Sequence, residues 1–507
     1  MSCSDSLPVA SAQSSLQVRW ILLALCLIVT VGVWLDASVV FKSPYAVGAD
    51  GYYYVLQINE LLNRGQFYFP TQTPLILYAL AAVSFFTSDP VVSIKLASIA
   101  LHAALCLGLF AVIVSVTRSR WLGVVGSALA AVSGAHLYMI AEYVKQLGAL
   151  AFLIWGGWFA LQFFKTRRTV WALLSIACVV AAIFSHRSAF PLVLISAALV
   201  ISVRLLYAKS VNRKYRLAVL ALLFLFWYSP VIVAFQPFVQ LPAWVEMEIT
   251  APGLPLSKGA APEQMILMVL SPLALVLIFL ESHKSRDEVS TLALGSVALW
   301  SFLITINPFL DYGKPNNFTW RLSILAYIQV AILVPGVIWL TRQHPKVIAL
   351  VAAFVLPLIV GSRIQSQPFG LRTDYLSARA ALLRRLPLYR QQLDQTPLVI
   401  SPHGEQFVVT YSLGVPSQQR WPEKTQSRTI YWLLHRIRPN FFLPSMLVIM
   451  QEREGFYTVL VKDNDIRQQL GNISDAERRW IFMNNPHLKE EAMRRDQTQG
   501  LAAQNPP

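Results

Sequence analysis

Apolar stretches of about 20 residues recur along most of this chain, with short loops between them. A helix needs about 20 apolar residues to cross the hydrocarbon core of a bilayer, and lipid offers no partner for an unpaired backbone group. The pattern therefore predicts a polytopic, all-α membrane domain over residues 20–361. We expect eleven spans, near residues 20–40, 91–117, 122–138, 147–164, 169–185, 189–206, 217–235, 264–281, 289–306, 321–340 and 346–361.

A further apolar stretch, residues 74–86, is short for a span. We expect a helix that lies in or dips into the membrane interface. As a full span it would be the twelfth, and it would reverse every later loop relative to the first.

Composition supports a membrane protein and argues against nucleic-acid binding. The chain is 55% hydrophobic and 13% charged, whereas soluble domains carry roughly 25% charged residues. The formal net charge of +16 would suggest nucleic acid in a soluble protein. Here the basic residues lie mostly in short loops between apolar runs, and no folded basic module is visible.

The basic residues favour alternate loops, which predicts the orientation of the chain. We expect residues 1–19 to be cytoplasmic and everything after Gly361 to lie outside, in a protein of a bacterial inner (plasma) membrane. The loops assigned to the cytoplasm are rich in basic residues: Arg118, Arg120, Lys165, Arg167, Arg168, Lys209, Arg213, Lys214, Arg216, Lys284, Arg286, Arg342 and Lys346.

Residues 362–493 predict a small extracytoplasmic α/β domain, followed by a disordered tail at 494–507. Strands are expected at Pro397–Ser401, Phe407–Tyr411 and Phe456–Val461. The domain begins with a basic amphipathic stretch that we expect along the membrane surface, with Arg372, Arg379, Arg384, Arg385 and Arg390.

The first outer loop, residues 41–90, contains the most informative motif. Val55, Ile58 and Leu61 recur at helical spacing, which predicts a short interfacial helix that also carries Tyr53 and Tyr54. Asp50 directly precedes this helix. A carboxylate there can act in chemistry, or it can simply cap the helix.

The order of four motifs resembles the GT-C superfamily of glycosyltransferases, which use polyprenyl-phosphate-linked sugars, and is similar to its protein mannosyltransferase and aminoarabinose transferase families. Asp50 follows the first span, Lys95 opens the next, Glu142 lies in the second outer loop, and Arg321 begins a late span that reaches Pro335. Two features depart from that pattern. Gly51 stands where a second acid is common, and no Trp-Trp-Asp signature occurs in the C-terminal part, so whole-oligosaccharide transfer to asparagine is not expected.

The resemblance implies roles that fit the chemistry of sugar transfer. Asp50 would be the general base for an acceptor hydroxyl, and Glu142 a second acid that orients the acceptor or holds a divalent metal. The departing phosphate needs cations rather than a general acid, and these would be Lys95, Arg187 and Arg321. The implied donor is a polyprenyl-phosphate-linked sugar, and the acceptor a lipid, glycan or protein.

Each of these residues also has a plain structural interpretation. Lys95 can snorkel to the interface, Arg187 can anchor a helix end, Arg321 can flank its span, and Glu142 can pair with Lys145.

Four weaker candidates for substrate contact are Tyr53, Tyr54, Asp311 and Glu246. Asp311 is also a typical turn residue, and Glu246 lies in a proline-rich outer loop, where solvation is the simpler explanation. His102 and His136 are expected to be hydrogen-bonded core residues, because the histidines show no metal-ligand spacing.

Two other functions remain open from the sequence. A transporter would place ionisable residues near the middle of the bilayer on broken helices, whereas most charges here sit at span ends. A non-catalytic lipid-binding assembly protein of the cell envelope would share the same architecture.

Overall fold

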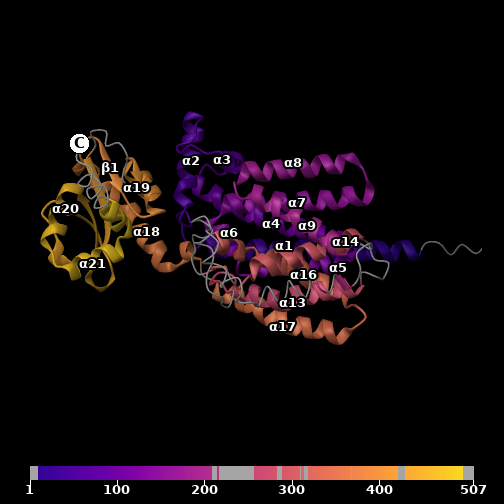
Figure 1. Ribbon diagram of the computed structural model, residues 1–507. Coiled ribbons are helices and arrows are strands. Elements are labelled where there is room, and N and C mark those ends of the chain that lie inside the picture. Colours follow the sequence, from indigo (N-terminus) through magenta and orange to yellow (C-terminus); the bar gives the residue numbers. More distant parts are fainter. Residues whose placement is uncertain are drawn as a thin grey trace, which may run out of the picture. The chain divides into compact units, whose positions relative to one another are not determined.

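The computed structural model describes residues 9–207, 256–281, 288–308, 310–312, 318–366, 368–420 and 429–494, with three residues between 214 and 218 (Figure 1). The chain divides into two compact units. The helical unit comprises Met1–Lys42, Pro70–Ser88 and Lys95–Pro368. The sheet unit comprises Ser43–Phe69, Asp89–Ile94 and Phe369–Pro507.

The helical unit consists of apolar helices. Its described elements are α1 (Val9–Val40), α3 (Leu75–Thr87), α4 (Pro90–Thr117, whose first turn belongs to the sheet unit), α5 (Arg120–Val132), α6 (His136–Glu142), α7 (Val144–Thr166), α8 (Thr169–Ser185), α9 (Ala189–Tyr207), α13 (Ala261–Glu281), α14 (Glu288–Trp300), the π-helix Ser301–Thr305, α15 (Phe318–Ile324), α16 (Ala326–Leu340) and α17 (Pro345–Gln365).

Seven of the described helices, or eight counting the bent pair α5–α6, are long and apolar enough to cross a membrane. Three shorter apolar helices accompany them: Leu75–Thr87, Thr169–Ser185 and Ala189–Leu205. The predicted polytopic helical class is confirmed, and this is an integral membrane protein. The predicted span at 217–235 lies outside the described residues.

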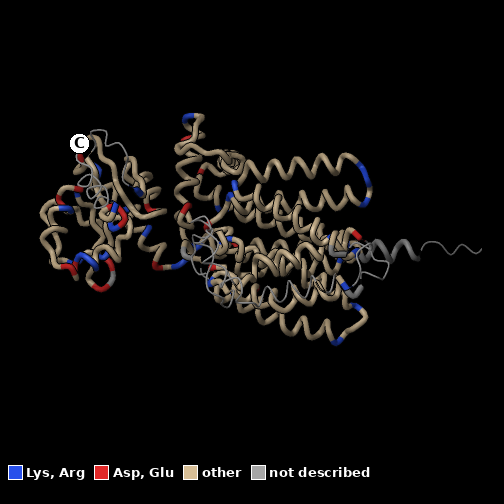
Figure 2. The backbone as a smooth tube through the Cα atoms, in the orientation of Figure 1, with Lys and Arg blue, Asp and Glu red and all other residues tan. Residues whose placement is uncertain are grey.

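Burial varies among the helices as expected for a bundle in lipid. The segment Phe318–Leu340 is 89% buried, and within it α16 packs against both α5 and α13. The terminal segments Val18–Val40 and Pro345–Gln365 bury only 17% and 22% of their apolar windows, which leaves apolar surface for lipid. Most charged residues of the helical unit lie at helix ends and in loops (Figure 2).

The segment predicted as a span at 122–138 is not one continuous helix, because α5 and α6 are bent by 54° at a break. The break frees backbone donors, and serine side chains accept from them. Gly134 N donates to Ser362 Oγ at 3.0 Å, and Ala135 N donates to Ser133 Oγ at 3.2 Å. Ser133 and Ser362 both donate in turn to the buried Glu263 carboxyl. A side chain at Gly134 would overlap the backbone of Ser362, so glycine permits this close approach.

The sheet unit contains a five-stranded mixed sheet in the order β2-β1-β3-β5-β4. β1 pairs in parallel with β2 and β3, whereas β3–β5 and β5–β4 are antiparallel. The strands are β1 (Pro397–Ile400), β2 (Ser417–Gln418), β3 (Thr429–Ile437), β4 (Leu447–Gln451) and β5 (Tyr457–Lys462). The helices are α2 (Gly51–Arg64), α18 (Thr373–Arg385), α19 (Glu405–Leu413), α20 (Asp463–Asn472) and α21 (Asp475–Asn484).

Two of the three predicted strands are confirmed, as β1 and β5. The third, Phe407–Tyr411, is wrong because it lies inside α19. A short run of apolar residues is typical of a buried strand. A short helix with a buried face can contain the same run, so this pattern alone does not distinguish the two. Gly414 ends this helix in the left-handed conformation, a common stop signal.

Candidate active site

Asp50 occupies the N-cap position of α2, but its side chain makes no capping hydrogen bond. Asp50 therefore stands at the helix cap but does not cap α2 through a side-chain hydrogen bond. Its carboxylate Oδ1 lies 3.6 Å from Nε2 of His403, and both side chains are partly exposed, at 35% and 53%. The predicted base is thus accessible and has a histidine beside it.

The backbone just before Asp50 is held by Arg379 of α18. The guanidinium donates to the carbonyl oxygens of Ala46 (3.2 Å), Gly48 and Ala49 (3.5 Å). Arg379 is only 2% exposed, so its side chain packs inside the sheet unit, and the membrane-surface location of its stretch stays a prediction. A buried guanidinium with three carbonyl acceptors fixes the loop that presents Asp50.

Tyr53 and Tyr54, two weaker candidates, belong to the packed face of α2. The Tyr53 ring lies 5.4 Å from Phe407 and 5.9 Å from Phe69, and its hydroxyl accepts a hydrogen bond from Gln57 at 3.0 Å. Tyr54 is buried. These contacts tie α2 to α19, and a role in substrate contact stays a prediction for both tyrosines.

A charged network follows directly after His403 in the sheet unit. Glu405, at the start of α19, lies 2.7 Å from His435 of β3, and Glu452 lies 3.6 Å from the other ring nitrogen. Burial opposes protonation of His435, but the two carboxylates outweigh it and raise its pKa to about 10. The network therefore holds a protonated histidine between two anions at neutral pH.

His186 lies between α8 and α9, and the positive charges of three basic residues of the helical unit act on it. Burial, and after it the positive charges of Arg321, Lys145 and Arg187, lowers the pKa of His186 to about 4. We call Lys145, His186, Arg187 and Arg321 the cation cluster. Arg187 and Arg321, both predicted to bind the donor, act electrostatically on the same histidine together with Lys145, which sequence analysis did not propose, and donor binding stays a prediction for them.

Arg321 is the most constrained member of the cation cluster. Its guanidinium stacks 5.0 Å from the ring of Tyr143, and its Nε is buried with no hydrogen-bond partner among the described residues. A buried donor without an acceptor costs about 1–3 kcal/mol, so an anion beside Arg321 would be stabilised. Lys145 donates to Thr71 Oγ1 at 3.2 Å.

Glu142 lies at the end of α6, beside the cation cluster in sequence, and is 9% exposed. Tyr143 interrupts the helix between Glu142, at the end of α6, and Lys145, in the first turn of α7. Lys95 is 2% exposed, and its ammonium lies 5.2 Å from the Phe41 ring. A lysine that extends its ammonium group to the membrane interface would be more exposed than Lys95 is.

The structure shows little about the last two candidates for substrate contact, Asp311 and Glu246. Asp311 accepts a hydrogen bond through its backbone carbonyl from Thr319, and Glu246 lies outside the described residues.

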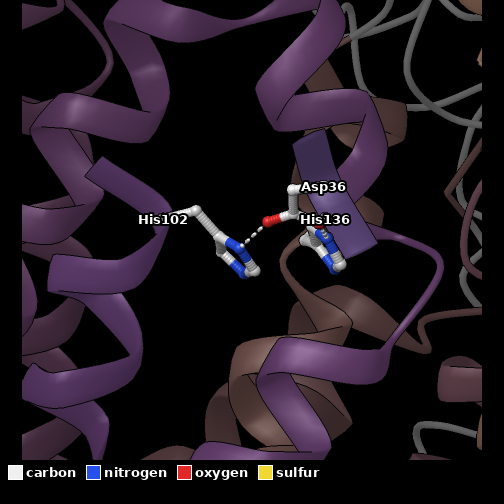
Figure 3. A group of neighbouring side chains, drawn as sticks. All are labelled: Asp36, His102 and His136. Atoms are coloured by element: carbon white, nitrogen blue, oxygen red, sulfur yellow. Dashed lines mark hydrogen bonds and ion pairs between the residues drawn. The ribbon is translucent and has the colours of Figure 1, made fainter. Parts of the chain in front are cut away.

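Sequence analysis missed a buried cluster around Asp36 of α1 (Figure 3). Its Oδ2 lies 2.7 Å from His102 Nδ1 on α4, and its Oδ1 lies 2.7 Å from His136 Nε2 on α6. Arg363 of α17 lies 3.7 Å from the same Oδ1 and donates to the carbonyl of Leu35. Both histidines are hydrogen-bonded core residues, as predicted, but their shared partner was not foreseen.

The Asp36 cluster has the residue types of a metal site, and its ligand atoms lie within 4.8 Å of one another. Its geometry fits an ion-pair network better. The nitrogen of each imidazole that faces Asp36 is already hydrogen-bonded to its carboxylate at 2.7 Å, and the two rings stack with centroids 4.0 Å apart and planes 12° apart. Arg363 Nη1, 3.3 Å from His136 Nε2, would also repel a metal cation.

Comparison with known proteins was informative only at the level of structure. No protein-family model matches the sequence, and no curated protein matches it. The fold is similar to the apo oligosaccharyltransferase of Archaeoglobus fulgidus, with 12% identity and a TM-score of 0.56 over 78% of this chain. The likeness covers 64% of that protein, so this chain spans less than two thirds of its length.

Two structures of ArnT from Cupriavidus metallidurans, one bound to undecaprenyl phosphate and one in the apo state, are similar at 13% identity. They cover 86% and 88% of this chain and 97% and 98% of ArnT, with TM-scores of 0.47 and 0.48. Both scores lie below 0.5, so the fold assignment rests on the oligosaccharyltransferase. The chain has the fold of a GT-C glycosyltransferase.

Proposed function

We propose that this protein is a membrane glycosyltransferase that moves a sugar from a polyprenyl-phosphate carrier to an extracytoplasmic acceptor, with inversion at the anomeric carbon. The observation that carries the proposal is the cation cluster, in which Arg321 keeps a buried Nε without a partner among the described residues. A phosphate would supply the missing acceptor and offset the positive charge that Lys145, Arg187 and Arg321 concentrate there.

The reaction needs one base and several cations. As the acceptor oxygen bonds to the anomeric carbon, the bond from that carbon to the phosphate oxygen breaks, and the hydroxyl proton passes to Asp50. The phosphate leaves with its charge developed, so the cations stabilise it and no general acid is required. Glu142 would orient the acceptor or hold a divalent metal. Lys95 would contribute a further buried positive charge.

The membrane setting suits a lipid-linked donor. A phosphate at headgroup depth would meet cations at helix ends, and an isoprenoid tail would lie among apolar helices. The proposal places the protein in a bacterial plasma membrane, with its N-terminus in the cytoplasm and the sheet unit outside.

Deletion of the gene tests the activity directly. The deletion strain should accumulate the lipid-linked sugar, and its lipid extract then serves as donor for the purified protein in detergent. Wild-type protein should consume this donor, whereas Asp50→Asn should slow consumption by roughly 10²-fold or more, since a general base typically contributes that much. Full activity of Asp50→Asn would remove Asp50 as the base, and no accumulation would contradict the transferase.

Donor binding is tested with polyprenyl phosphate against the uncharged polyprenol. Arg321→Gln should weaken binding of the phosphate by roughly 10- to 100-fold, because hydrogen bonds to charged groups contribute about 1.5–3 kcal/mol. Arg342→Gln makes the same chemical change just beyond the other end of this span and should leave binding unchanged. Equal binding of phosphate and polyprenol would argue against a phosphate site.

A transporter is the second candidate, because the break between α5 and α6 lies among the buried ionisable residues His136, Asp36 and Glu263. The detergent assay separates the two functions. An enzyme consumes donor without a sealed membrane, whereas a transporter has no substrate gradient to act on in micelles.

A further inference from the structure

His403 lies in a loop of the sheet unit, and this loop contacts the backbone beside Asp50. This loop follows the carboxyl end of β1, a strand with parallel neighbours on both sides. Functional residues in such sheets commonly lie at the carboxyl ends of parallel strands. The amide of Ser401 donates to the carbonyl of Gln418 at 3.1 Å, and its hydroxyl bonds to that of Ser417, so the loop begins at a fixed position.

Gly404 brings the loop onto the backbone beside Asp50. Its φ of +85° is a conformation that side chains rarely adopt, and a Cβ there would lie 3.0 Å from the carbonyl oxygen of Ala49. Both the conformation and the close approach therefore require glycine. This approach brings His403 Nε2 to 3.6 Å from the Asp50 carboxylate.

The far end of the loop is anchored by charge. Glu405 pairs with His435 at 2.7 Å, and its own pKa is lowered: burial acts to raise it, but the charge and hydrogen bond of His435 prevail. On the other side of the contact, Arg379 fixes the carbonyls of residues 46, 48 and 49. The pair Asp50–His403 is thus set by two independently supported segments.

We infer that His403 is a positioning residue for Asp50, whose imidazole N–H orients the carboxylate toward the acceptor hydroxyl. The inference rests on the proposed function and deepens it by giving the C-terminal sheet a part in the active site. The 3.6 Å separation is longer than a hydrogen bond, and catalytic hydrogen bonds without substrate are commonly long and tighten when it binds.

A histidine suits this position better than a lysine or arginine. A permanent cation beside a carboxylate stabilises its ionised form and weakens it as a base. A neutral imidazole donates one hydrogen bond and leaves the carboxylate more basic. Glutamine can donate a similar bond without charge, whereas leucine cannot.

The test compares His403→Leu and His403→Gln in the detergent assay, with the lipid extract of the deletion strain as donor. His403→Leu should lower the maximal rate of donor consumption by roughly 10²-fold, the effect of a misplaced catalytic group, with half-saturation unchanged. His403→Gln should recover most of that rate. His344→Leu, at an exposed histidine between α16 and α17, serves as the matched control and should match wild type.

Each outcome has one meaning. If Asp50→Asn is inactive while His403→Leu retains the wild-type rate, the positioning role is overturned and the transferase stands. If His403→Leu and His403→Gln lower the rate equally, a hydrogen bond from His403 does not position Asp50, and the inference is overturned. If Asp50→Asn remains active, Asp50 is not the base, and this inference fails while the transferase stands. If no lipid-linked sugar accumulates, the proposed function fails, and this inference with it. His403→Ala replaces leucine should that variant unfold early in a thermal scan.

Discussion

Asp36→Asn tests the buried charge network of the helical unit. Asparagine keeps the size of the side chain and still hydrogen-bonds, so the main loss is the negative charge opposite Arg363. Removing one partner of a buried ion pair typically costs 3–5 kcal/mol. Because the Arg363 side chain keeps 18% of its exposure, we expect the lower end, about 3 kcal/mol, or a roughly 150-fold shift in the folding equilibrium.

A double-mutant cycle isolates this term. Arg363→Gln added to Asp36→Asn removes the stranded charge, so the double variant should be more stable than Asp36→Asn alone. Unfolding in detergent, followed by tryptophan fluorescence against denaturant, measures each variant. Glu288→Gln, an exposed acid at the start of α14, should change stability little. Wild-type stability of Asp36→Asn, or simple additivity of the two changes, would refute the reasoning.

Three further predictions concern other sites. Gly404→Ala should destabilise the sheet unit by about 1–3 kcal/mol through backbone strain and its clash with Ala49, and slower donor consumption in detergent should accompany it. Because folding raises the pKa of His435, its protonation should stabilise the fold fully below the ordinary pKa of 6.5, and this stabilisation should fade as the pH rises toward 10. Hydrogen exchange of β3 in the full chain measures the stability at each pH. His435→Gln should abolish this pH dependence. Ser362→Ala should cost about 1–3 kcal/mol in denaturant unfolding because it leaves the buried Gly134 N–H unpaired, whereas Ser202→Ala, at an exposed helix position, should not.

The membrane helices were largely predictable because their signal is local. A run of some 20 apolar residues identifies a span regardless of its neighbours, so α4, α7 and α17 follow directly from the sequence. The break between α5 and α6 was not predictable, since the residues that accept its freed backbone donors include Ser362, more than 200 positions away.

The candidate site was predictable where a motif carried it and hidden where tertiary structure created it. Arg187 and Arg321 were chosen from their places at span ends, and the charges of both act on His186. His186 and Lys145 join the cation cluster only through the fold. Asp36 lies 66 and 100 positions from its two histidine partners, a separation that no local pattern reveals.

Arg379 illustrates a related difficulty. On a helix of mixed composition, a buried arginine that binds three carbonyls has the same sequence pattern as an arginine that faces water.

The sheet unit is discontinuous in sequence: Ser43–Phe69 and Asp89–Ile94 belong to the same compact unit as the C-terminal strands. The stretch between the first two, Pro70–Ser88, contains α3. With its 13 residues, α3 is roughly 20 Å long against a hydrocarbon core of about 30 Å, so this helix is too short to cross the core upright.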